Sequence, residues 1–264
     1  MSGPFLFEPS DPVPRAMNRY RAALTHFALS VLVVGTVFLL VYFIWYPEPL
    51  FRGAGGRDLF LVLAFVDVTI GPLVTLLIFK PGKWGLKFDL AVIAILQVAA
   101  LAYGTHVVFE ARPAWIVFLK DRFDLVRANQ LFEEERDRWK PPFDREPLDG
   151  PRIAGARIPK DPDEQFRTML TALAGADVSS FPQHYVPYAE VRADAAAKGR
   201  SVRDLRSLNP GRVAEVDRAL ASLGRREEEV AFLPMRAGKR DLAVLIDAKS
   251  GDVLALADFR PWKY

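Results

Sequence analysis

Apolar residues are concentrated in three long runs that contain few charged positions and lie before residue 110. A membrane core about 30 Å thick requires about 20 apolar residues in a helix that rises about 1.5 Å per residue. Three windows reach that length, so the sequence predicts transmembrane helices over about 24–44, 59–79 and 90–109. An aromatic pair and Pro47 follow the first window where a cleavage site would need small residues, which favours an uncleaved signal anchor.

Beyond residue 110 the apolar runs are short and alternate with charged and turn-forming residues, as is typical of a globular domain. A β-hairpin is predicted over 115–126, and three strands joined by two tight turns are predicted over 230–259. A short charged helix is expected over 129–139, followed by an irregular loop rich in Pro and Gly over 141–162.

Apolar residues at helical spacing predict four further helices in this second half. One follows a capping Asp161 or Asp163 and has an apolar face that includes Phe166, Met169 and Leu170, which we expect to be core. The others are expected over 189–198, 201–208 and 213–223. The predicted fold class is therefore a membrane α-helical part with three transmembrane helices, followed by a small α+β soluble domain. Its sheet is expected to be antiparallel, with helices covering one face.

The charge distribution supports this division of the chain. Residues 1–109 contain 8 Lys/Arg and 6 Asp/Glu, whereas residues 110–264 contain 27 and 26. We therefore predict a disordered, cytoplasmic segment over 1–20, a transmembrane domain over 21–109 and an α+β domain over 110–264. The near-zero net charge of the last domain disfavours nucleic-acid binding, and the absence of Cys excludes disulfides and thiolate catalysis.

Lys and Arg in the short flanks predict the orientation, because positive residues resist transfer across a bacterial inner membrane. The flank before the first window and the loop at 80–89 together carry six, and the loop at 46–58 carries two. This bias predicts a multi-pass inner-membrane protein with a cytoplasmic N-terminus and a periplasmic C-terminal domain. The predicted cytoplasmic loop contains Lys80, Lys83, Lys87 and Asp89.

Polar residues inside the predicted spans are the sharpest candidates for function. Asp67 lies near the middle of the second span, where a carboxylate must face protein because its exposure to lipid is costly. Thr75 shares its helical face, and Gln97 of the third span lies at a similar depth, within reach of a hydrogen bond. Three interpretations of these residues and His26 remain open. They hold the helices together, they bind a partner helix, or they form a path for an ion or a proton.

Signals for catalysis are weak in the predicted outer domain. It contains one His, His184, and Ser179 and Ser180 lie too close to it in sequence to indicate a catalytic triad. The acidic triplets at 133–135 and 227–229 lack the pattern of a metal site. We therefore expect no catalytic residue, no metal and no cofactor.

The run FVDVTIGPLVTLLIFKPGKWGLKFDLAVIAILQ at 65–97 resembles the TfpX/TfpZ family of type IV pilin accessory proteins. Further similar pieces lie at 45–50, 112–131 and 239–262. The residues that carry the family's blocks are Asp67, Gly71, Pro72, Leu73, Thr75, Lys80, Gly82, Lys83, Leu86, Lys87, Asp89 and Leu90.

The resemblance implies a non-catalytic inner-membrane protein that helps the type IV major pilin to be stabilised, held or assembled. Membrane lipid and other pilus assembly proteins are further expected partners, and nucleic acid is not. Asp67, Gly71, Pro72, Thr75 and Gln97 are the hypothetical pilin-binding residues. Two alternatives remain: a membrane-anchored periplasmic enzyme that modifies pilin, and a periplasmic ligand-binding or sensor module.

Overall fold

The computed structural model describes residues 17–173 and 177–263, which form two compact units. The first unit contains the residues up to 34 together with 64–101, and the second contains 35–63 together with the rest of the chain from 102. Each long apolar helix contributes to both units, so the domain limits at 20 and 109 stay a prediction. The disorder predicted for the start of the chain falls mainly on residues 1–16, outside the described residues.

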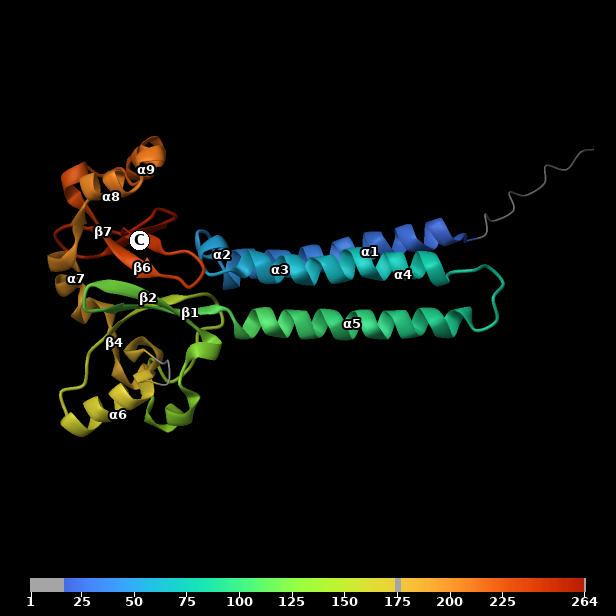
Figure 1. The fold of residues 1–264 in the computed structure, drawn as a ribbon, viewed down its shortest axis with the longest axis horizontal. Coiled ribbons are helices and arrows are strands. Elements are labelled where there is room, and N and C mark those ends of the chain that lie inside the picture. The colour runs from blue at the N-terminus through green and yellow to red at the C-terminus, as the bar shows by residue number, and fades with distance from the viewer. Residues whose placement is uncertain (1–16, 174–176, 264) are drawn as a thin grey trace, which may run out of the picture. The chain divides into compact units, whose positions relative to one another are not determined.

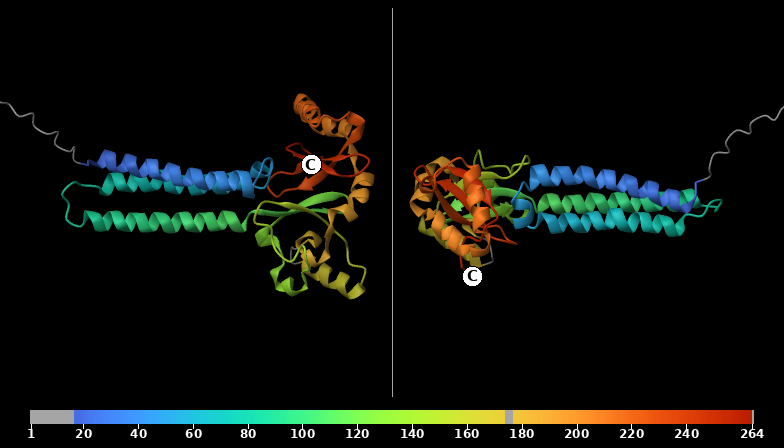
Figure 2. Two further views of the ribbon diagram at one scale, coloured as in Figure 1. Left: turned by 180° about the vertical axis from the view of Figure 1, so that it is seen from behind. Right: turned by 90° about the horizontal axis from the view of Figure 1, so that it is seen from above.

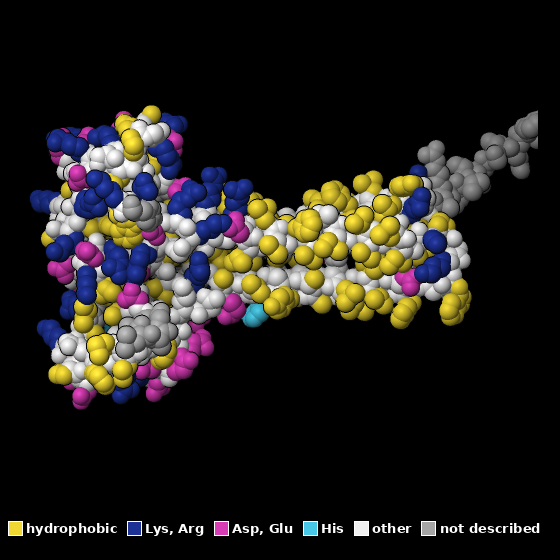
Figure 3. Space-filling model, viewed as in Figure 1, with side chains coloured by type: hydrophobic (Ala, Val, Ile, Leu, Met, Phe, Trp, Pro, Cys, Tyr) yellow, Lys and Arg dark blue, Asp and Glu magenta, His cyan; other side chains and the backbone are white. Residues whose placement is uncertain are grey.

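Three helices are long and apolar enough to cross a membrane by length and composition, as the sequence predicts. Apolar side chains are exposed along them, whereas Lys, Arg, Asp and Glu gather on the surface of the sheet domain (Figure 3). The first helix joins α1 to a π-helical turn, the second joins α3 and α4 through another π-helical turn, and the third is α5 alone (Figure 1). Their bounds are α1 Arg19–Leu40, its π turn Val41–Trp45, α3 Gly56–Phe65, its π turn Val66–Ile70, α4 Gly71–Ile78 and α5 Leu86–Glu110.

The segment between the first two long helices is part of the fold of the second unit. It contains the short helix α2 (Leu50–Gly53), whose Gly53 carbonyl accepts hydrogen bonds from the backbone N–H groups of Lys239 (3.2 Å) and Arg240 (3.1 Å). A Cβ on Gly53 would lie 2.8 Å from a methyl carbon of Leu242, so any other residue here would displace the buried Leu242 side chain. The sequence alone shows this segment only as a connection between two spans.

The described residues form one sheet of eight strands, ordered β4-β3-β1-β2-β6-β7-β8, with β5 paired to β6. The hairpin β1–β2 and the meander β6–β7–β8 are confirmed. The strands are β1 Pro113–Leu119, β2 Arg122–Arg127, β3 Arg152–Ala156, β4 Tyr185–Pro187, β5 Arg200–Ser201, β6 Val230–Arg236, β7 Leu242–Asp247 and β8 Val253–Ala257.

The prediction of a purely antiparallel sheet is wrong. β1 pairs in parallel with β3, with Trp115 opposite Arg152, and β2 pairs in parallel with β6, with Phe123 opposite Met235. β3 also lies inside the run 141–162 that the sequence indicates as an irregular loop. The sheet is therefore mixed, and the domain is α+β as predicted.

The four helices predicted in the second half are present, with small changes at their ends. Asp161 accepts the backbone N–H of Glu164 (3.2 Å) at the start of α6, and Ser201 accepts that of Asp204 (3.2 Å) at the start of α8. The charged helix predicted over 129–139 is instead two 3₁₀ turns. The helices are α6 Pro162–Leu173, α7 Arg192–Lys198, α8 Val202–Leu208 and α9 Val213–Ser222.

Both faces of the sheet are covered, although the sequence predicts helices on one face only. On one face α8 and α9 pack against β6 and β7, joining side chains such as Leu205 and Leu220 to Phe232 and Leu245 (Figure 2). On the opposite face Leu242 contacts α2. The burial of every β7 residue from Leu242 to Ile246 follows from this two-sided cover.

The apolar face of α6 departs from its predicted role. Phe166, Met169 and Leu170 recur at helical spacing as expected, but 57%, 53% and 49% of their surfaces stay exposed. Polar contacts attach this helix to the domain, because Arg138 donates two hydrogen bonds to the carboxylate of Glu164 (2.7 and 2.6 Å). Helical periodicity thus identifies the apolar face correctly but does not show whether that face is buried.

Candidate functional site

The π-helical turn Val66–Ile70 places Asp67 inside the first unit. A π turn widens the helix locally, and such turns are frequent at functional sites. Pro72 follows one turn later, and because it lacks an N–H it cannot complete the regular backbone pattern there. Asp67 faces the other helices and is 3% exposed, as the sequence predicts for a carboxylate in the middle of a long apolar helix.

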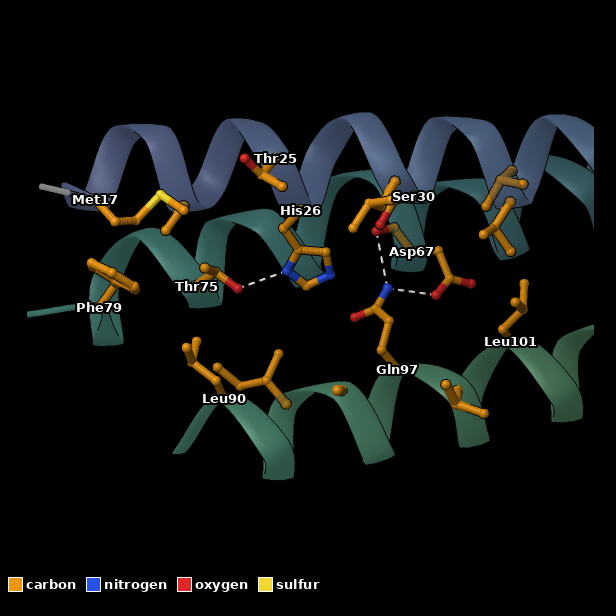
Figure 4. A pocket seen from close by; sticks show the side chains of 17 residues that line it. Met17, Thr25, His26, Ser30, Asp67, Thr75, Phe79, Leu90, Gln97 and Leu101 are labelled. Carbon is orange, nitrogen blue, oxygen red and sulfur yellow. Dashed lines mark hydrogen bonds between the residues drawn. The ribbon is translucent and has the colours of Figure 1, made fainter. Parts of the chain in front are cut away.

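Gln97 of α5 binds Asp67 directly. Its Nε2 donates to the Asp67 side chain (Oδ1, 2.5 Å) and to the Asp67 backbone carbonyl (2.9 Å) (Figure 4). Gly71 makes room for this contact, because a Cβ at Gly71 would overlap the Gln97 amide. The hydrogen bond expected between the second and third long helices is therefore formed. Gln97 donates it, and Gly71 leaves the space that the Gln97 amide occupies.

A second polar contact joins the first helix to the second. Nδ1 of His26 in α1 lies 2.7 Å from the hydroxyl oxygen of Thr75, which is buried (Figure 4). The sequence indicates His26 only as an additional member of the polar set, and the structure makes it the partner of Thr75. We call His26, Asp67, Thr75 and Gln97 the polar seam.

The polar seam lies in a groove of about 440 Å³ that α1 and α5 border from opposite sides. Apart from Thr25, Ser30 and the seam itself, its walls are apolar, with Leu29 and Val33 from α1 and Ile93 and Leu101 from α5. Figure 4 shows His26 and Gln97 directed into this space from different helices. Pro72, which the sequence places in the same candidate set, does not line the groove.

The loop between the second and third long helices holds an ion pair. Lys83 Nζ lies 2.5 Å from Asp89 Oδ2, whereas Lys80 lines a shallow hollow with Asn18 and Arg19. Trp84 at the tip is almost fully exposed. Of the three lysines predicted to lie on the cytoplasmic side, only Lys83 pairs with Asp89 within the described residues; Lys80 and Lys87 form no ion pair there.

The family model and the three relatives that match this chain are all described as fimbrial assembly proteins. The model of the family "Fimbrial assembly protein FimB" matches residues 14–55. A "Fimbrial assembly protein, serogroups C1 and C2" of Dichelobacter nodosus is 33% identical over 113 residues, which cover 42% of this chain and 86% of that protein. This chain belongs to the FimB fimbrial assembly protein family.

Longer matches extend the FimB relationship along most of the chain. The "Fimbrial assembly protein, serogroup I" of Dichelobacter nodosus is 29% identical over 214 residues, 80% of this chain and 83% of that protein. The serogroup E1 protein of the same organism matches with the same identity and coverage. No solved structure matches the chain. Membership of the FimB family supports the role in fimbrial assembly that the resemblance at 65–97 implies. The finer assignment to the TfpX/TfpZ family stays a prediction.

A polar cluster in the sheet domain of this FimB-family chain contains His184. Its imidazole Nε2 lies 3.6 Å from Glu164, which Arg138 also binds. Within the described residues neither Ser179 nor Ser180 forms a hydrogen bond with His184, and no group of three or more His, Asp or Glu could hold a metal ion. His184 thus lies beside the ion pair that Arg138 forms with Glu164 of α6.

This polar cluster predicts a pH dependence of stability. Burial lowers the pKa of His184 below its ordinary value of 6.5, and the hydrogen bond from Arg138 lowers the pKa of Glu164 below 4.5. Because the unfolded chain then binds these protons more readily, stability is greatest above pH 6.5 and falls as the pH drops through both values. Thermal unfolding of the full chain in detergent between pH 7.5 and about 4 would measure this. His184→Gln should reduce the loss of stability just below pH 6.5. An unchanged dependence of stability on pH would contradict a contribution from His184.

Proposed function

We propose that this chain is an accessory protein of type IV fimbrial assembly that binds the major fimbrial subunit through the groove between α1 and α5. Membership of the FimB family supports the fimbrial role. The observation that carries the binding proposal is the groove itself, with apolar walls and a floor formed by the polar seam. In a bilayer, helices associate through close packing and interhelical hydrogen bonds, which such a groove supplies.

The expected occupant is an apolar helix of the subunit. Asp67 Oδ1 is used by Gln97 and His26 Nδ1 lies against Thr75, which leaves Asp67 Oδ2 and His26 Nε2 for a polar group of an incoming helix. Thr25 and Ala94 border the groove from α1 and α5. A helix with small residues and one hydroxyl or amide fits this pattern, because it approaches closely and satisfies the remaining polar atoms.

The membrane placement is part of the proposal. The three apolar helices suggest membrane association, and Lys80, Lys83 and Lys87 favour a cytoplasmic position for the loop that contains them. We place the protein in the bacterial inner membrane, with the N-terminus in the cytoplasm and the sheet domain in the periplasm. There the sheet domain could meet the globular part of a subunit whose helix lies in the same bilayer.

A non-catalytic role is likewise proposed, as is the absence of a cofactor. The charged side chains of the sheet domain are largely engaged with one another, as in the pairs Arg206–Asp217 and Arg212–Glu215. His184 is held against Glu164. Glu164 and His184 line one hollow of the sheet domain, but Arg138 binds the Glu164 carboxylate there. An enzyme that modifies the subunit would need an acid and a base that are both free to act in a shared cavity. An unchanged subunit mass in cells that lack this protein would support the accessory role over the enzyme alternative.

Photocrosslinking tests the groove directly. Photoreactive residues placed at Thr25 and Ala94, which border the groove, are expected to form adducts with the fimbrial subunit in cells that produce it. Gly71 and Thr75 are less suitable positions because both are buried against other helices.

The matched controls are the sequence neighbours Leu24 and Ile95, which are exposed on other faces of α1 and α5 and do not border the groove. One position along a helix rotates a side chain by about 100°, so the two members of each pair differ in direction rather than depth. Adducts from Thr25 and Ala94 alone would support the groove. Equal adducts from all four positions, or none, would refute it.

A further inference from the structure

The two edges of the sheet differ in their protection against pairing with another strand. β4, at one edge, has three residues and ends at Pro187, and both features discourage the addition of a strand. β8, at the other edge, has the sequence Val-Leu-Ala-Leu-Ala without Pro, Lys or any other charged residue. Edge strands of soluble proteins normally carry such protection. Its absence from β8 requires an explanation.

Among residues 17–173 and 177–263, no strand pairs with the outer side of β8. Its residues pair with β7, from Ala243 opposite Ala257 to Ile246 opposite Val253. Among the described residues, the one other backbone hydrogen bond of β8 is in the turn where Phe259 N–H donates to the Ala257 carbonyl. Val253, Leu254, Ala255 and Leu256 are half-buried rather than covered. Alternate N–H and C=O groups of the strand therefore face outward, as an added strand requires.

We propose that β8 pairs edge to edge with an extended segment of the fimbrial subunit's globular part. This inference rests on the proposed function and adds a second contact, outside the groove. Main-chain hydrogen bonds supply the affinity of such pairing, and the apolar side chains of β8 on alternate faces restrict which sequences fit beside them. The occupant is thus an extended segment with apolar side chains.

The charges that flank β8 favour this occupant over a second copy of the chain. Antiparallel pairing of two β8 strands centred on Ala255 would place Asp252 of each opposite Asp258 of the other. Like charges directly opposite in a sheet are destabilising. Arg192 and Arg240 bind these two aspartates through ion pairs at the surface, which are weak and offset this repulsion only in part. A segment with neutral or basic flanks avoids this conflict.

Crosslinking and amide exchange on the full chain test the proposal. A photoreactive residue at Leu256 should form an adduct with the fimbrial subunit, and the matched residue at Val186 of β4 should not. With purified subunit added to the detergent-solubilised chain, amide exchange should slow within residues 253–257 and stay unchanged in β4.

The outcomes separate this inference from the proposed function when Thr25 is crosslinked in parallel. An adduct from Thr25 without one from Leu256 would overturn the edge contact and leave the groove intact. An adduct of Leu256 with a second copy of the chain would also overturn it, in favour of self-association. Loss of both subunit adducts would overturn both proposals.

Discussion

Replacing Arg112 by Ala is expected to lower the free energy of unfolding by about 3–5 kcal/mol, because it leaves the largely buried carboxylate of Glu146 with only the half-exposed Arg136, 3.6 Å away, as a partner. Arg112 lies between α5 and β1 and is 2% exposed. Its guanidinium stacks on the ring of Phe109 at 3.7 Å, donates to the Phe109 carbonyl (2.8 Å) and binds Glu146 (3.3 Å). It thus joins the end of the third long helix to the loop before β3.

Unfolding of the full chain in detergent, followed by tryptophan fluorescence, would measure this loss. Arg152→Ala is the matched control, since Arg152 forms an exposed pair with Asp149, and such pairs contribute about 0–1 kcal/mol. Arg112→Met combined with Glu146→Leu should recover much of the stability, because no charge is then left buried. A loss for Arg112→Ala as small as that for the control would show that Arg112 is not a structural anchor.

Replacing Asp67 by Leu is expected to weaken co-purification of the fimbrial subunit by about tenfold, the equivalent of one interhelical hydrogen bond of about 1–2 kcal/mol. Insertion should be unaffected, because Leu is more compatible with the membrane core than Asp. The reason for the loss is that Asp67 orients Gln97 and supplies a free oxygen at the floor of the groove. Quantitative pull-down from detergent extracts, with piliation assayed in the same strains, would measure it.

Gln97→Leu separates two roles of Asp67. If Asp67 acts only by holding α5 through Gln97, both variants should lose the same amount of subunit and the double variant no more. If Asp67 contacts the subunit itself, Asp67→Leu should cost more than Gln97→Leu. Co-purification and piliation unchanged by Asp67→Leu would show that the polar seam serves bundle packing alone.

The alternation of apolar and polar residues was sufficient to predict the strands whose pairing partners are close in sequence. The hairpin β1–β2 and the meander β6–β8 were predictable because alternating apolar residues flank short turns. β3 was not, since Arg152–Ala156 contains a single β-branched residue and lies in a stretch rich in Pro and Gly. Its parallel pairing with β1 connects residues far apart in sequence, for which no local signal exists.

The candidate site shows the same limit. The Asp67–Gln97 hydrogen bond was predictable from the depth of the two residues, because a polar atom in a span must find a partner. The His26–Thr75 contact and the walls that α1 contributes depend on the rotation of one helix against another. The role of Arg112 could not be predicted, because the sequence shows only one basic residue after an apolar run. Its partner Glu146 lies 34 positions later.

The close fit of α2 to the sheet affects how this protein can be divided. A fragment that starts at residue 110 would lack Leu50 and Phe51, which are buried, and the carbonyl groups of Gly53 and Ala54 that Lys239, Arg240 and Arg127 bind. Leu242 would then face water. The sheet domain is therefore built from two separate stretches of sequence, and parts of two long helices with their connecting loop lie between these stretches. Only a chain that includes the first stretch can complete the core of the domain.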